Sequence, residues 1–341
     1  MQNSSHDLTG SLGPRVWAAM VVVYIIWGST YLAIRVIVTD GLPPMLAMGS
    51  RFLVAGVLLA LVLSARGGPR RLRVGRRELA NNAMVGGFLL LGGTGLVAVA
   101  EQDVPSGLTA LLVGTTPLWL VGFRTATGDR PGWMTWLGTA VGFAGVAVLA
   151  RPGGHNDDIP VTSTLIVVLA TLLWASGSFA STRMTLPKDP FVAAVWQMII
   201  AGVAMIAVGF AIGEGPRLSD VVAAGLPLGG IVAWGYLVVA GSLLAYTAYY
   251  WLLRQAPISL VSTYAYVNPV VAVVLGWALL SETVDATVLV GGGLAVVGVL
   301  LVVSTERHGH AHPPVADAES TAKAASSPDA RPQRLVRSSD R

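Results

Sequence analysis

PMLAMGSRFLVAGV, residues 44–57, returns later in the chain as PFVAAVWQMIIAGV, residues 190–203. The match keeps the leading proline, places Gln197 where the first copy has Arg51, and ends on the same Ala-Gly-Val. Further matches follow along both halves at a nearly constant offset: Trp27 with Trp174, Pro105 with Pro257, Pro117 with Pro269, Gly138 with Gly291 and Gly145 with Gly298. The sequence therefore carries one unit twice, which is a recurrent plan for secondary transporters.

The composition indicates a membrane protein. Of 341 residues, 54% are apolar and only 12% are charged, against about 25% charged in a soluble domain. A block of about 20 apolar residues crosses the hydrocarbon core as a helix, and only helices or closed barrels satisfy their backbone there. Alternating barrel strands are missing, so the sequence predicts an all-α integral membrane protein with ten transmembrane helices, at about 16–37, 44–64, 80–100, 106–125, 132–150, 162–182, 190–212, 228–252, 258–280 and 286–304.

Ten helices divide into two repeats of five. Because five is odd, the second repeat enters the membrane from the opposite side, and the repeats are predicted to be inverted. The predicted organisation is an N-terminal segment 1–15, a first repeat 16–150, an external linker 151–161, a second repeat 162–304 and a disordered tail 305–341. The tail is rich in Ala, Ser, Pro and charged residues, a composition typical of disorder.

Basic residues set the predicted orientation. With the N-terminus in the cytoplasm, the predicted cytoplasmic segments hold 18 of the 22 Lys and Arg residues, and the opposite side holds Arg151 and Arg217. This bias is the positive-inside signal, so both termini are expected on the cytoplasmic side of the inner membrane. The cluster of arginines at 66–77 is then a topology determinant beside anionic lipid rather than a nucleic-acid site.

Several function classes lack their sequence signals. There is no cysteine, and the glycine runs lack the Gly-Lys-Ser/Thr ending of a phosphate loop. No metalloprotease or serine-hydrolase motif occurs, so neither an enzyme nor a cofactor is predicted. The first apolar block is too long for a cleaved signal peptide and is expected to stay as an anchor. Three histidines, His308, His310 and His312, lie in the tail, where an incidental cluster is favoured over a metal site.

Several stretches together resemble the EamA branch of the drug/metabolite transporter superfamily, over about residues 16–304. They are Trp27-Gly28-Ser29-Thr30-Tyr31 with Arg35, Pro44 with Arg51-Phe52, Leu108 to Pro117, Trp174, Tyr266-Val267-Asn268-Pro269 and Leu279-Leu280-Ser281-Glu282. Asp129 and Ser281 depart from the Glu and Gly of that pattern. The resemblance implies a ten-helix transporter of small metabolites, often an exporter, with a central cavity built from both halves.

Polar and aromatic residues at membrane depth are the candidates for that cavity. Aromatic rings with hydroxyl groups suit a substrate that is part apolar and part hydrogen-bonding, although packing or an interfacial position is the alternative for each. The candidates are Trp27, Thr30, Tyr31, Thr116, Trp174, Ser178, Tyr246, Tyr250, Tyr264 and Asn268. Pro117 and Pro269 each remove one helical hydrogen bond at matching places in the two copies, which predicts hinges near the midplane.

Four charged residues near or within the spans are candidates for substrate or proton coupling. Such groups are costly in hydrocarbon and are functional candidates by default. Arg35 and Arg51 could bind a carboxylate-bearing substrate, but snorkelling or pairing with Glu101 is favoured. Glu101 and Glu282 are the plausible acids for proton coupling, but solvated charges at external helix ends are favoured.

The sequence thus predicts an ATP-independent secondary transporter, with export the favoured direction, that moves a small amino acid-like or drug-like metabolite by alternating access. The alternatives are a membrane-embedded protein without transport activity, either an enzyme or a lipid-binding or regulatory protein, and a proton-coupled multidrug carrier. The predicted partners are a small-molecule substrate and membrane lipid, with no nucleic acid. The oligomeric state is left open between monomer and homodimer.

Overall fold

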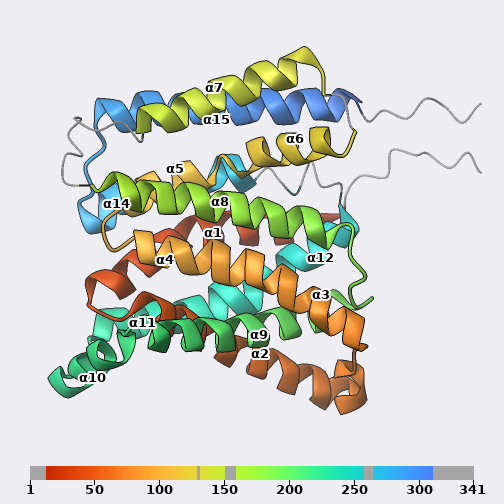
Figure 1. Ribbon diagram of the computed structural model, residues 1–341, viewed down its shortest axis with the longest axis vertical. Helices are drawn as coiled ribbons and strands as arrows, with labels where there is room; N and C mark the ends of the chain where they lie inside the picture. The colour runs from red at the N-terminus through yellow and green to blue at the C-terminus, as the bar shows by residue number, and fades with distance from the viewer. Residues whose placement is uncertain (1–12, 129–130, 150–158, 257–260, 262–263, 310–341) are drawn as a thin grey trace, which may run out of the picture.

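The computed structural model describes residues 13–128, 131–149, 159–256, 261 and 264–309, and these residues form helices and loops without a β-strand (Figure 1). The helices that run unbroken are α1 Pro14–Thr39, α2 Pro44–Gly67, α7 Trp133–Leu149, α8 Val161–Ser181, α9 Pro190–Ala211, α14 Tyr264–Leu280 and α15 Ala286–Gly309. The others are short or composite: η1 Pro69–Leu72, α3 Arg76–Gly86, η2 Gly87–Gly95, α4 Leu96–Ala100, α5 Ser106–Val113, α6 Thr116–Ala126, α10 Glu214–Ala224, α11 Leu228–Tyr236, η3 Leu237–Tyr246 and α12 Thr247–Gln255.

Within the described residues, each predicted apolar block falls mostly on helix, with a break at Gly114–Thr115. Seven of the described helices are long and apolar enough to cross a membrane: Pro14–Thr39, Pro44–Gly67, Arg76–Ala100, Ser106–Ala126, Val161–Ser181, Pro190–Ala211 and Leu228–Leu252. Three further apolar helices are shorter within the described residues, at Trp133–Leu149, Val267–Leu280 and Ala286–Val302. The chain is therefore an all-α, multi-pass membrane protein, and the number of ten crossings stays a prediction.

Two segments differ from the sequence-based expectation. The predicted loop after residue 212 contains an additional helix, α10, whose short amphipathic pattern is too polar for a membrane span. Helix α15 continues to Gly309, beyond the predicted end of the last span at residue 304. Most of the predicted N-terminal segment, most of the linker and the tail from residue 310 lie outside the described residues.

Equivalent helices of the two repeats lie side by side at opposite edges of the molecule (Figure 1). Helices α2 and α9, which carry the duplicated stretch, form one edge, and α7 and α15 form the other. Small residues allow this close approach: a Cβ atom on Gly202 would lie 2.8 Å from the carbonyl oxygen of Gly49, and one on Gly145 would lie 2.5 Å from the amide nitrogen of Ala295. Without a side chain at these glycines, the backbones of the paired helices can approach closely.

Two membrane helices contain π-helical segments at equivalent places in the two copies. η2 runs over Gly87–Gly95 within the span that begins at Arg76, and η3 runs over Leu237–Tyr246 within the span that begins at Leu228. π-Helical turns are rare and frequently mark functional sites, because the widened turn re-aims side chains and frees backbone groups. The sequence patterns used above did not predict them.

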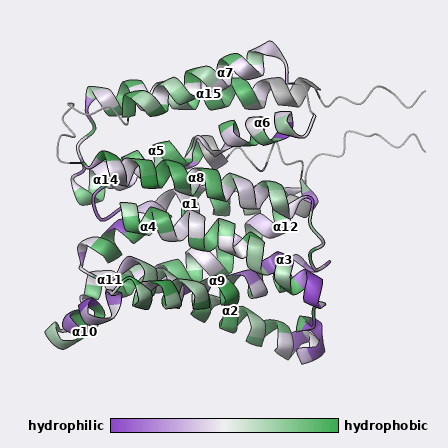
Figure 2. Ribbon diagram, in the orientation of Figure 1, coloured by the Kyte–Doolittle hydropathy of each residue, from purple (hydrophilic) through white to green (hydrophobic). Residues whose placement is uncertain are grey.

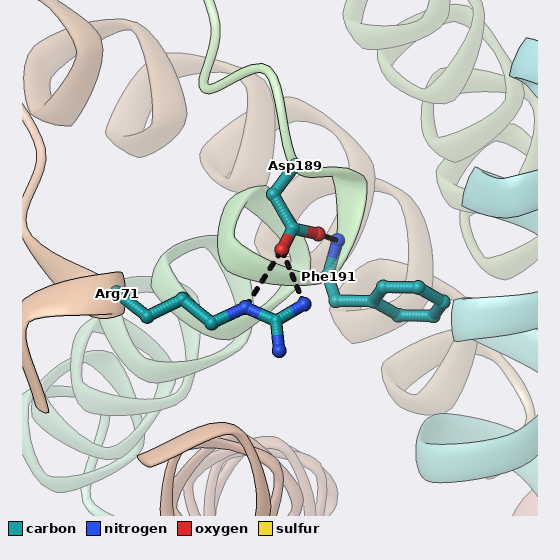
Figure 3. A network of polar contacts seen from close by, with 3 residues as sticks. All are labelled: Arg71, Asp189 and Phe191. Atoms are coloured by element: carbon teal, nitrogen blue, oxygen red, sulfur yellow. Dashed lines mark hydrogen bonds and ion pairs between the residues drawn. The ribbon is translucent and has the colours of Figure 1, made fainter. Parts of the chain in front are cut away.

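Polar residues collect at the ends of the helices, while the lengths of the helices are mostly hydrophobic (Figure 2). At one end, Arg71 of η1 donates from Nε and Nη2 to Oδ2 of Asp189, at 3.0 and 2.6 Å. Oδ1 of Asp189 accepts from the amide of Phe191 and so caps α9 (Figure 3). Two loops that the arginine pattern assigns to the cytoplasm therefore meet at the same end of the bundle.

The opposite end holds another cap, which carries the first of our predictions. Glu214 is buried and accepts from the amides of Met45 and Leu46, at 3.1 and 2.9 Å, at the start of α2. Pro44 has no amide proton, so these are the first two free donors of the helix. We expect Glu214→Ala to destabilise the protein by about 1–3 kcal/mol, because it leaves both donors unpaired. Thermal unfolding in detergent measures this, with the exposed Asp220→Ala as the matched control; equal unfolding temperatures for the two variants would contradict the cap.

Candidate functional site

A cavity lies at the centre of the bundle between helices of both copies. Its volume is about 70 Å³, which holds a few water molecules but is well below the roughly 300–1,000 Å³ of small-molecule sites. The first half contributes Trp27, Thr30, Tyr31, Ile34, Arg51, Phe52, Leu90, Gly93, Thr94, Val97 and Val113, and the second half contributes Ala170, Thr171, Trp174, Gly241, Tyr246 and Tyr264. Both π-helical segments line it, through Leu90, Gly93 and Thr94 of η2 and through Gly241 and Tyr246 of η3.

Aromatic rings form one side of the cavity. Trp27 of α1 is the centre of the group: its ring centroid lies 5.8 Å from that of Trp174, 5.2 Å from that of Tyr264 and 4.8 Å from that of Tyr249. The first two contacts are edge-to-face, the arrangement that the quadrupoles of aromatic rings favour. The duplicated tryptophans thus pack on each other, and both also face the cavity.

Arg51 supplies the charge of the cavity. It lies on α2, its residue exposure is 4%, and its Nε donates to Oγ of Ser242 at 2.9 Å. Nη1 lies 3.5 Å from the sulfur of Met48, and the guanidinium carbon lies 4.6 Å from the centre of the Phe52 ring. The expectation that Arg51 snorkels to the interface or pairs with Glu101 is wrong: the side chain stays in the core and bonds to Ser242.

Gln197, the equivalent of Arg51 in the second copy, joins three polar side chains beside the cavity. Its Oε1 accepts from the hydroxyls of Tyr246 and Tyr250, each at 2.6 Å, and its Nε2 donates to Oδ1 of Asn82 at 3.0 Å. A polar group buried among apolar helices needs such partners, so this network fixes the rotamers of both tyrosines. Gln197 and Asn82 were not among the predicted site residues; a lone glutamine in the apolar stretch 190–212 is the signal that could have found the network.

The acid Glu101 lies at the end of α4 and is completely buried, with an exposure of 0%. Its two carboxylate oxygens have no hydrogen-bond partner among the described residues, and its carbonyl oxygen accepts from Nη1 of Arg35. The expectation of a solvated helix-end charge is therefore wrong for Glu101. Burial raises the pKa of this carboxyl well above its ordinary value, the nearby charge of Glu282 raises it further, and Arg35 partly opposes both.

Glu282 is half-buried and holds the start of α5. Its two carboxylate oxygens accept from the amides of Ser106 and Gly107, at 2.8 and 3.1 Å. The interpretation of Glu282 as a freely solvated charge is therefore wrong as well. From the loop before α15, Glu282 caps the start of α5, where its negative charge complements the dipole of that helix.

Some predicted site residues lie away from the lining of the cavity. Ser178 donates to the carbonyl oxygen of Trp174 at 2.9 Å, and Thr116 donates to that of Val113 at 2.6 Å. With its amide nitrogen turned toward the carbonyl oxygens of Tyr264 and Tyr24, buried Asn268 donates to both, at 3.3 and 3.2 Å. Tyr250 is held by Gln197, as described above.

The two predicted hinge prolines differ from each other. Pro117 stands in the first turn of α6, just after the interruption at Gly114–Thr115 that separates this helix from α5. Pro269 lies inside α14, which continues through it. Of the two, only Pro117 adjoins a break in the described helices.

Nothing in the described part of the chain gathers three or more metal-ligating His, Cys, Asp or Glu side chains. The candidate site is instead a polar and aromatic cavity between apolar helices. The model of the EamA-like transporter family matches the chain twice, at residues 16–151 and 162–304. The chain belongs to the EamA-like transporter family. It is therefore a membrane transporter, and the two matches cover the two copies of the repeat.

Relatives within the EamA family extend over most of the chain. The uncharacterized inner membrane transporter YedA of Escherichia coli (strain K12) is 39% identical over 289 residues, which cover 84% of this chain and 90% of the relative. A Streptantibioticus cattleyicolor protein named "Probable terminal-alkyne amino-acid exporter" is 31% identical over 300 residues, covering 85% and 94%. A solved crystal structure matches 86% of this chain and 98% of its own with a TM-score of 0.59, and at 16% identity it shows a shared fold alone.

Proposed function

We propose that this EamA family member is a secondary transporter that moves a small organic metabolite across the inner membrane by alternating access. The observation that carries the proposal is the central cavity, because residues from both segments that match the EamA family, 16–151 and 162–304, line it. A site shared between two repeats can open to one face or the other when the repeats exchange conformations. Its volume of about 70 Å³ is too small for a metabolite, so the arrangement fits a closed conformation that must widen to bind substrate.

The inverted arrangement of the repeats is the second part of the proposal. Equivalent helices pair at both edges, α2 with α9 and α7 with α15, and equivalent π-helical segments flank the cavity. Such pairing is what a pseudo-two-fold axis in the membrane plane would produce. The arginine bias supports a cytoplasmic position for both termini and for the Arg71–Asp189 end. The break before Pro117 is the candidate hinge.

Export of an amino acid-like or amphipathic compound is the direction and substrate type that we favour. One support is that the Streptantibioticus cattleyicolor relative is named as a probable terminal-alkyne amino-acid exporter. The other is a cavity that combines aromatic rings with hydroxyl groups. Proton-coupled multidrug efflux is less well supported, because no carboxylate is among the residues that line the cavity; a cationic drug would need one.

The test is transport by the purified protein in proteoliposomes against a panel of amino acids and drugs, with and without a pH gradient. We expect Trp27→Ala to lower the rate for any transported compound about tenfold or more, because Trp27 holds three aromatic neighbours and faces the cavity. The control is Trp133→Ala, at a residue that is 73% exposed at the start of α7. Equal rates for these two folded variants, or no transport of any compound by the unaltered protein, would overturn the proposal.

A further inference from the structure

We propose that Arg51 binds the carboxylate of a substrate that carries one carboxylate group and an apolar body, an assignment that rests on the proposed transport function. The geometry behind it is a buried cation that lines the central cavity without a counter-charge. The relevant chemistry is the planar guanidinium fork, whose paired donors match the two oxygens of a carboxylate.

The first step concerns charge balance. No ion pair joins Arg51 to an acidic side chain among the described residues, and its hydrogen-bond partner, Ser242, is neutral. An unpaired cation inside a membrane protein is costly and is normally compensated by a partner or marks the path of a substrate or ion. The charged neighbours of Glu101 are Arg35 and Glu282 rather than Arg51, so this buried acid does not supply the missing charge.

The second step concerns the donors that remain on Arg51. A guanidinium has five N–H groups, of which the Nε donor is used by Ser242. The Nη1 contact with the sulfur of Met48 is a weak one at 3.5 Å. Nη2 lies against Gly241 of η3, where a Cβ atom would stand 2.8 Å away, so a larger residue at this position would displace the fork. Ser242, Phe52 and Gly241 thus fix the guanidinium plane and leave donors for an anion in the cavity.

The third step concerns the rest of the cavity. Its other lining residues are apolar, aromatic or hydroxyl-bearing, and none is acidic. Trp27, Trp174 and Tyr264 offer ring faces and edges to an apolar body, while the arginine is the one cation that lines this pocket. One fixed cation and a group of aromatic rings in the same cavity match one carboxylate on an apolar skeleton. The same lining disfavours dicarboxylates and cationic drugs.

The second copy explains why there is a single such site. At the position equivalent to Arg51 stands Gln197, whose amide is committed to Asn82, Tyr246 and Tyr250. The pseudo-symmetric partner is therefore neutral and engaged. Gln197 also shows that a glutamine fits at the equivalent position of α9, the helix that pairs with α2. Arg51→Gln therefore introduces a residue that the second copy already carries at this position.

The experiment measures binding to the purified full-length protein in detergent by thermal shift, so it does not depend on transport. The probes are matched pairs: 3-phenylpropionate with 3-phenylpropanamide, and L-phenylalanine with L-phenylalaninamide. We expect at least one carboxylate to raise the unfolding temperature while its amide does not. Arg51→Gln should weaken the apparent affinity for that carboxylate by about 30-fold or more. The apparent affinity of Arg51→Lys should lie between those of the unaltered protein and Arg51→Gln, because lysine keeps the charge but lacks the paired donors of the guanidinium.

The control is Arg71→Gln, which removes an exposed arginine of η1, beyond the C-terminal end of α2, and should leave binding unchanged. Equal stabilisation of the unaltered protein by amides and carboxylates, stabilisation by no carboxylate in the panel, or unchanged binding in Arg51→Gln would each overturn the assignment. The comparison of carboxylate with amide uses the unaltered protein, so it decides the matter even if a variant fails to fold. Carboxylate binding without transport would instead count against the proposed function alone.

Discussion

Replacing Gly298 with leucine is expected to prevent assembly of the folded protein. Gly298 of α15 packs directly on α7: a Cβ atom there would lie 2.3 Å from the amide nitrogen of Gly142, 2.4 Å from its Cα and 2.6 Å from the carbonyl oxygen of Gly138. These neighbours are backbone atoms, which cannot rotate away as a side chain can. The two helices would have to separate along their whole contact, at a cost of about 3 kcal/mol or more.

The matched control for this prediction lies on the same helix. Gly293 has no atom within 4 Å of the position that a Cβ would take, so Gly293→Leu should express and elute like the unaltered protein. Size-exclusion chromatography of detergent extracts, followed by thermal unfolding, distinguishes the two variants. A monodisperse Gly298→Leu protein with an unchanged unfolding temperature would show that the close approach of α7 and α15 is not required for the fold.

The helical fold was largely predictable from the sequence because its cause is local. An apolar block of sufficient length must be helical in a bilayer. For the second helix, the predicted bounds of 44–64 differ from the observed bounds of Pro44–Gly67 by only three residues at one end. The amphipathic helix α10 was missed, because its short polar stretch lies in a predicted loop and lacks the apolar length that identified the other helices.

The site was only partly predictable, because burial at a given depth is decided by packing between distant segments. Sequence reasoning named the aromatic residues Trp27, Trp174 and Tyr264, since such residues are conspicuous in an apolar span. It could not show that Arg51 turns inward to Ser242, 191 residues away. Nor could it show that Glu101 is enclosed, since helix-end residues are usually solvated. The π-helical segments have no simple sequence pattern, so the turns that bring Thr94 and Gly241 to the cavity were missed.

Glu101→Gln is expected to remove most of the pH dependence of the protein's stability. Burial raises the pKa of this carboxyl above its ordinary value of 4.5, with Glu282 adding to the shift and Arg35 opposing it. The folded protein therefore keeps a proton that the unfolded chain releases above pH 4.5. Stability is full below that pH and declines as the pH rises toward the raised pKa, by up to about 1.4 kcal/mol per pH unit. Glutamine has nearly the same shape and no such proton to lose, so the variant should unfold at a nearly constant temperature.

Unfolding temperatures in detergent between pH 5 and pH 9 measure this effect, with the exposed Asp220→Asn as the control that should retain the slope of the unaltered protein. An equally steep slope in Glu101→Gln would show that the buried carboxyl is not the group responsible. The same variant separates two modes of transport in proteoliposomes. If Glu101 carries the coupled proton, its replacement leaves a rate that no longer responds to the pH gradient; if the carboxyl serves only to pack α4 against Arg35, the response to the gradient persists. Because Glu101 does not line the cavity, loss of that response need not weaken the binding of substrate, so the proton site and the substrate site are separable by measurement.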